Sequence, residues 1–177
     1  MDTELDYNTA CNAYENKDYT KAYELFYKLA MQSDVSCQMN VANMLLHGLG
    51  VEQNSDRAYE WFEQAAINED KEAQYIYGWQ CIEHENEEEG IKQISLSAEA
   101  GFLDAIHDLA GFYFHGAHGL EVDFSKASVY YEKAVFLGRK HALAHLFSSK
   151  KKELGKFKAF FYFMKNISSF SKAVRNS

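Results

Sequence analysis

The chain has 177 residues, of which 47% are hydrophobic and 15% aromatic, with no proline and a formal net charge of −8 at pH 7. This length suits one compact domain or one short repeat array, and a disordered chain would contain far fewer aromatic residues. The absence of proline favours helices joined by glycine and polar loops over a sheet protein rich in turns.

Charge is distributed unevenly along the chain. Residues 150–177 contain eight basic residues and one acidic residue, a net charge of +7, whereas residues 1–149 contain 10 basic and 25 acidic residues, a net charge of −15. An acidic body is poorly suited to phosphate groups, so we expect no nucleic-acid partner. It favours basic protein partners through electrostatic steering.

The first residues are acidic and lack the apolar core of a signal peptide. The longest strongly apolar run, AFFYFM at residues 159–164, is far shorter than the ~20 residues that span a bilayer. We therefore predict a cytoplasmic protein. Its three cysteines, Cys11, Cys37 and Cys81, are odd in number and fall within helical patterns, which indicates small core residues and not disulfides.

Small residues recur through the chain with the spacing of a two-helix repeat. They close each second helix at Leu29-Ala30, Ala65-Ala66, Ser97-Ala98 and Ala134-Val135, at intervals of 36, 32 and 37 residues. A second series opens each second helix at Ala22, Ala58, Gly90 and Ala127. Small residues at fixed positions let neighbouring helices approach closely.

The spacing predicts four helix pairs within an array at residues 1–149. The units cover about 4–34, 35–70, 71–103 and 104–140, with helices at 4–15 and 18–32, 35–46 and 55–67, 71–83 and 86–99, and 104–115 and 124–137. HALAHLFSSKKKELG, residues 141–155, fits a further first helix. KFKAFFYFMKNISSF, residues 156–170, fits a second helix or a capping helix, so we assign residues 150–177 to a basic, aromatic cap and tail.

Two of the units share a glycine turn, a small residue, an aromatic pair and a final small residue. The second unit has Cys37, Val41-Ala42, Leu45, Gly48, Gly50-Val51, Ala58, Trp61-Phe62 and Ala65-Ala66. The fourth has Ala105, Leu109-Ala110, Tyr113, Gly116, Gly119-Leu120, Lys126-Ala127, Tyr130-Tyr131, Ala134 and Gly138. Both resemble Sel1-like repeats (SLR), a subfamily close to tetratricopeptide repeats.

The other two units depart from this pattern. The first has a short loop and is more similar to a tetratricopeptide hairpin, and the third replaces the glycine turn with HENEEEG and lacks the aromatic pair. The resemblance, which covers about residues 4–142, implies an all-α fold: a right-handed α-solenoid of about four helix-turn-helix repeats with a C-terminal capping segment. Each pair in such an array buries its apolar face by stacking on the next.

The resemblance also implies a non-catalytic module that binds another protein on its concave face, which the first helix of each unit lines. Aligned to the family pattern, the positions between core residues are Met39, Asn43 and Leu46, then Tyr75, Trp79 and Ile82, then His107, Gly111 and Phe114. An exposed apolar groove of this kind would be a binding site, with Trp and Tyr as hot spots. The alternative is that some of these residues pack in the core or against the last helix.

Two charged features have a structural and a functional interpretation. The acidic run Glu83, Glu85, Glu87, Glu88 and Glu89 fits a solvated turn and helix start, or an acidic lip that attracts a basic partner. The stripe Phe157, Phe160, Phe161, Met164 and Ile167 falls on one face of a basic helix. We favour a cap that covers the end of the fourth unit; the alternative is a helix that docks on a membrane surface or a partner.

The sequence contains none of the common motifs for catalysis or metal binding. His141 and His145 are four residues apart on a predicted helix, and His115 and His118 lie in a loop, but no HExxH or CxxC accompanies them, so we expect no metal. No GxSxG, GxxxxGK[ST] or GxGxxG is present. We therefore predict a non-enzyme without cofactors, although a Cys–His pair stays open at this point.

A short, acidic array of this kind also resembles the immunity proteins of bacterial toxin systems, each of which binds one toxin and blocks it. An acidic body would suit a basic toxin domain. The competing interpretation is a general adaptor or assembly scaffold, with the basic C-terminal helix docked on a membrane. We expect a monomer or a dimer.

Overall fold

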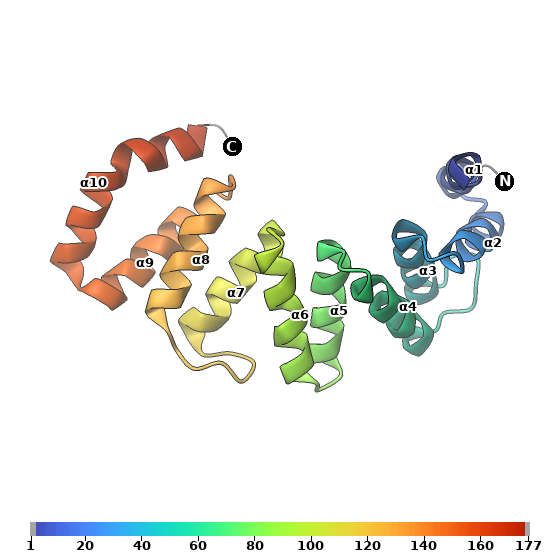
Figure 1. Ribbon diagram of the computed structural model, residues 1–177, viewed down its shortest axis with the longest axis horizontal. Helices are drawn as coiled ribbons and strands as arrows, with labels where there is room; N and C mark the ends of the chain where they lie inside the picture. The colour runs from blue at the N-terminus through green and yellow to red at the C-terminus, as the bar shows by residue number, and fades with distance from the viewer. Residues whose placement is uncertain (1–2, 176–177) are drawn as a thin grey trace. The chain divides into compact units, whose positions relative to one another are not determined.

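The structure is a computed structural model that describes residues 3–175, and these residues form α-helices and no strands (Figure 1). The helices are α1 (Thr3–Glu15), α2 (Tyr19–Ala30), α3 (Val35–His47), α4 (Ser55–Ile67), α5 (Lys71–Glu83), α6 (Glu87–Glu99), α7 (Leu103–His115), α8 (Phe124–Phe136), α9 (Ala142–Leu154) and α10 (Lys156–Arg175). The predicted all-α fold is confirmed, and the eight helices expected in the four units match α1 to α8 within two residues at each end.

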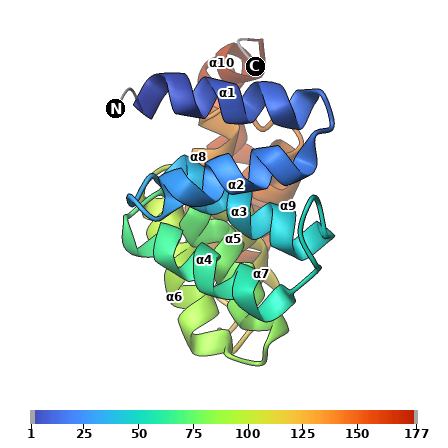
Figure 2. The same cartoon turned by 90° about the vertical axis from the view of Figure 1, so that its right-hand side faces the viewer.

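Contacts divide the chain into two compact units, Met1–Gln80 and Cys81–Ser177, with the boundary inside α5. From here on, the first and second unit are these two parts, and the four helix pairs are called repeats. In the first unit, α1 packs on α2, α2 on α3 and α3 on α4, and Figure 2 shows these helices stacked in chain order. In the second unit, α6 packs on α7, α7 on α8 and α8 on α9, while α10 lies against α9 and α8. These helices therefore bury their apolar faces against neighbours in the chain, as stacked repeats do.

Most second helices begin at an Asp or Asn side chain that accepts a hydrogen bond from the backbone N–H three residues later. Asn54 caps α4 in this way through Arg57, at 2.9 Å, and Asp123 caps α8 through Lys126, also at 2.9 Å. Asp18 and Asn86 cap α2 and α6 with longer bonds. Such caps satisfy backbone donors that the helix leaves unpaired, and each contributes about 1 kcal/mol.

The two glycine turns end α3 and α7 in the same conformation. Gly48 and Gly116 have φ angles of 65° and 69°, in the left-handed region that favours glycine at a helix end. Gly50, two residues further, has a second requirement: a Cβ there would lie 2.2 Å from the carbonyl carbon of Tyr19. The loop of the second repeat therefore rests directly on the start of α2.

The small residues that revealed the repeat are buried. Ala22, Ala58, Gly90 and Ala127 occupy the same place near the start of each second helix, and all four lie in the interior. In the aromatic pairs, Phe62 and Tyr131 are buried, and Trp61 and Tyr130 are half-buried. Cys37 and Cys81 are fully buried, as predicted, whereas Cys11 is half-buried.

The C-terminal stripe is the clearest departure from expectation. α10 does pack on α8 and α9, but through Ala159, Phe163 and Phe170, of which Phe170 stacks on Phe136 at 5.6 Å between ring centroids. The predicted cap-forming stripe is instead exposed: Phe157, Phe160, Phe161, Met164 and Ile167 are 52 to 82% accessible. The interpretation that this stripe covers the end of the fourth repeat is wrong. α10 has apolar residues on two faces, and only one of these faces packs against α8 and α9.

Candidate functional site

In the first unit, the predicted binding residues lie at the border between core and solvent. Met39 and Leu46 on α3, and Tyr75 and Trp79 on α5, are half-buried, and Asn43 is exposed. They alternate with fully buried core residues of the same two helices. Half-buried aromatic and aliphatic side chains can add contact area to a partner without first leaving the core, which is the usual property of an interface residue.

In the second unit, the predicted residues contact neighbouring helices. The ring of His107 on α7 lies 5.7 Å from that of Tyr131 on α8, 5.3 Å from that of His141, which immediately precedes α9, and 5.8 Å from that of His145 on α9. Its Nδ1 is 3.4 Å from a carboxylate oxygen of Asp108, and its Nε2 is buried without a hydrogen-bond partner. His107 thus lies where α7, α8 and α9 meet.

Phe114, one turn after Gly111 on α7, also packs within the second unit. Its ring lies 5.5 Å from that of Phe124 on α8, and the Lys152 ammonium of α9 is 4.1 Å from its centroid. A cation over an aromatic face at this distance is attractive by about 0.5–1 kcal/mol at exposed sites. The Lys152 side chain of α9 therefore covers part of the α7 face that the repeat pattern assigned to a partner.

The acidic run is divided between two environments. Glu85, Glu87 and Glu88 line a hollow of about 550 Å³ together with Ile82, whereas Glu83 is exposed at the end of α5. Glu89 turns along α6, where a hydrogen bond from Gln93 and the nearby Lys92 ammonium hold the pKa of its carboxyl below its usual value. Three of the five predicted carboxylates thus share one surface with an aliphatic side chain.

The histidines do not form a recognisable metal site. His118 packs on Phe112, and its Nδ1 lies 3.1 Å from Glu87, while His141 and His145 belong to the group around His107. Within residues 3–175, no three His, Cys, Asp or Glu side chains are placed to hold a metal ion together. Burial, and then the charges of the neighbouring histidines, lower the pKa of His145 below its ordinary value.

The cysteines are placed for packing. Burial, and then the charge of Asp34, raise the pKa of Cys37 to about 12, so its thiolate, the reactive form, is scarce at neutral pH. Cys81 has no exposed surface. A Cys–His catalytic pair, open on sequence grounds, finds no support at these two residues.

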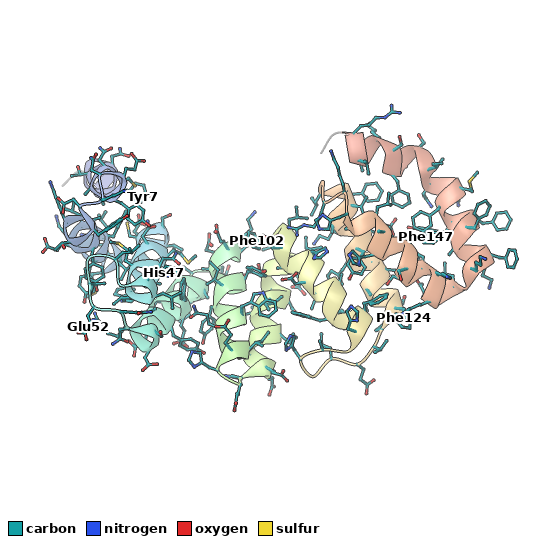
Figure 3. The ribbon with its side chains drawn as sticks, turned by 180° about the vertical axis from the view of Figure 1, so that it is seen from behind. Tyr7, His47, Glu52, Phe102, Phe124 and Phe147 are labelled. Carbon is teal, nitrogen blue, oxygen red and sulfur yellow. The ribbon has the colours of Figure 1, made fainter. Side chains whose placement is uncertain are left out.

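The last two helices form an apolar groove that sequence reasoning missed. It is open, has a volume of about 770 Å³, and nine of its eleven lining residues are apolar. In Figure 3, Phe147 of α9 lies between α9 and α10, and its ring is 5.1 Å from that of Phe163. The groove includes Leu143, Ala144 and Phe147 of α9, and Phe160, Met164 and Ile167 of α10. A stripe read on α10 alone could not show that α9 supplies the second wall.

None of the described helices has the length and apolar character needed to cross a bilayer.

Comparison with known proteins identifies the repeat. The Sel1 repeat family model matches residues 14–34, 35–70 and 103–135, which is half of the chain. It matches the two repeats with glycine turns and the later part of the first repeat, and it leaves out residues 71–102 of the third repeat, where HENEEEG replaces the turn. No curated protein sequence matches the chain significantly.

Several solved structures share the fold. A protective antigen of uropathogenic Escherichia coli with an SLR fold is similar at a TM-score of 0.73 and 23% identity, over 98% of this chain and 39% of that one. A Sel1 repeat protein from Oxalobacter formigenes has a TM-score of 0.75 and 21% identity, over 92% of this chain and 70% of that one. MamA has a TM-score of 0.59 and 18% identity, over 98% and 94%.

The solved structures share the fold of this chain, whereas the general class of protein follows from the family model. Sel1 repeat proteins generally mediate protein–protein interactions, and their fold is typically a non-catalytic scaffold. The chain spans about two fifths of the length of the E. coli antigen.

Proposed function

Because this chain belongs to the Sel1 repeat family, we propose that it is a non-catalytic module that binds a partner protein through the first-helix faces of its first unit. The binding residues are Met39, Asn43 and Leu46 of α3, and Tyr75 and Trp79 of α5. One observation carries this proposal: these helices present partly exposed apolar and aromatic side chains directly beside a fully buried core.

Preorganisation favours this surface. The side chains belong to helices whose core residues, such as Val41, Cys37 and Ala73, are fully buried, so the backbone beneath the surface is fixed by packing. Binding then costs little ordering of the chain. Tyr and Trp are the residues most often found at interface hot spots, and α5 offers both within one turn.

The charge of the molecule indicates what kind of partner would bind. Residues 1–149 have a net charge of −15, and such a surface accelerates association with a basic protein and disfavours an acidic one. We propose a basic toxin domain as this partner, with the present protein acting as its immunity protein in the cytoplasm. A general adaptor or assembly scaffold is the alternative, and the identity of the partner distinguishes the two.

The experiment is capture of partners from a lysate of the native cells with the wild-type protein and with a Tyr75→Ala, Trp79→Ala double variant. Circular dichroism must show that both are folded. We expect one basic protein to be retained by the wild type and lost with the variant. A partner retained equally by both would place the binding surface elsewhere, and a partner without toxin activity would favour the adaptor.

A further inference from the structure

We infer that the groove between α9 and α10 is a second binding site, separate from the first-unit surface, and that it accepts an acidic amphipathic helix of a partner protein. The inference rests on where the groove falls in the repeat, on the residues that line it, and on the charge of α10.

The position in the repeat indicates that a helix fits this groove. Within the second unit, α9 is held by His107 of α7 and by Tyr131 of α8, whose ring stacks on that of His145 at 5.2 Å. The pair α7 and α8 thus offers a surface that the following helix, α9, covers. The pair α9 and α10 offers the equivalent surface.

Alignment of the buried residues makes this equivalence specific. Fully buried Leu109 of α7 corresponds to fully buried Leu146 of α9, so His107 of α7 corresponds to Ala144 of α9 in the alignment. Fully buried Ala127 of α8 corresponds to fully buried Ala159 of α10, which sets Tyr131 against Phe163. Ala144 and Phe163 both line the groove. The two positions that hold α9 in one repeat therefore belong to the open groove in the next.

The lining makes the groove suited to an apolar helix face. Met164 and Ile167 are 52 and 60% exposed, and Phe147 is 46% exposed, an unusual amount of large apolar surface to leave in water at one place. Side chains from both helices contribute, so the surface is a trough with two walls. An amphipathic helix lays its apolar face into a groove of this form.

Charge decides among the possible occupants. α10 contains five basic residues and no acidic one, and Lys140 lines the groove. Two copies of this chain that paired α10 against α10 would bring these cations together, which is unfavourable. A partner helix with an acidic polar face would meet Lys140 at the groove, and the net positive charge of α10 beside it, with opposite charge as its apolar residues fill the groove.

The test uses a fluorescein-labelled peptide, LEELLEELLEELLEE, and its counterpart LKKLLKKLLKKLLKK, titrated with the full chain and followed by fluorescence anisotropy. We expect the acidic peptide to bind, with an affinity that falls as salt is added, and the basic peptide not to bind. Ile167→Glu should weaken binding about tenfold or more, because it adds a charge to the groove that must be buried unpaired and that repels the peptide.

Val129→Glu is the matched control. Val129 on α8 is also β-branched and 60% exposed, and it does not line the groove. The Val129→Glu variant should bind the acidic peptide with the affinity of the wild type. Met164→Glu repeats the test at a second groove position, in case Ile167→Glu disturbs the fold as judged by circular dichroism.

Several results would overturn the inference. These are no binding of the acidic peptide, equal binding of both peptides, or full binding by the folded groove variants. Sedimentation with phosphatidylserine-containing vesicles, lost in Ile167→Glu without any peptide binding, would assign the groove to a lipid surface. Self-association lost in the same variant would assign it to a second copy. Since Tyr75→Ala with Trp79→Ala leaves the groove intact, failure of this inference is distinguishable from failure of the proposed function.

Discussion

Replacement of Gly50 by alanine should destabilise the first unit strongly, because two separate constraints act at this residue. Its φ of +71° lies in the left-handed region, where a side chain costs about 1–2 kcal/mol. An added Cβ would also lie 2.2 to 2.5 Å from backbone atoms of Tyr19 and Thr20. Backbone atoms cannot rotate away, so the loop would have to move by about 1 Å, and overpacking of this kind costs about 1–3 kcal/mol.

The repeat provides a control for the first constraint alone. Gly119 occupies the equivalent place in the fourth repeat with φ of +75°, but a Cβ there would meet nothing within 4 Å. Urea unfolding followed by circular dichroism should therefore show a loss of about 2–5 kcal/mol for Gly50→Ala and about 1–2 kcal/mol for Gly119→Ala. Equal losses in the two variants would refute the contact between this loop and the start of α2.

Three further predictions follow from burial and charge. Phe170→Ala should lower the free energy of unfolding by about 3–5 kcal/mol, because the Phe170 side chain of α10 is buried against α8. Phe161→Ala, at an exposed position of α10, should change the free energy of unfolding by at most about 0.5 kcal/mol. Similar losses in both variants would mean that α10 packs through its other face. His145 has a lowered pKa in the folded chain and an ordinary pKa of about 6.5 in the unfolded chain, so the unfolded chain binds more protons near pH 6. The urea midpoint should therefore decrease as the pH is lowered from about 7.5 to about 5.5, and this decrease should be smaller in His145→Gln. In the native protein at about pH 8, Ellman's reagent should react with half-buried Cys11 well before buried Cys37; rapid modification of Cys37 would contradict its assigned burial.

The helices were predictable because the same pattern of small residues recurs in each repeat. Small residues such as Ala58 and Ala127 recur at one place in each unit, and each is buried there. Even the third repeat, which lacks the glycine turn, forms α5 and α6 at the expected residues. Spacing was sufficient because it reflects the close approach of stacked helices, which the turn sequence only assists.

The surfaces were less predictable, because exposure depends on what packs against a helix. The pattern of α10 showed an apolar stripe, but not that Phe163 and Phe170, outside this stripe, would be the residues that contact α9 and α8. In the same way, the pattern placed Phe114 on a binding face, and only the structure shows Lys152 of α9 lying over its ring. Periodicity defines the face of a single helix, whereas a binding site depends on its neighbours.

The most direct test of the central claim is calorimetry with the captured partner in purified form. The protein is proposed to bind it through the first-unit surface, so Tyr75→Ala with Trp79→Ala should weaken binding by about 2 kcal/mol or more, as expected for hot-spot residues. Val129→Glu, on an unrelated exposed face of α8, should leave the affinity unchanged. Unchanged affinity in the folded double variant would contradict the account.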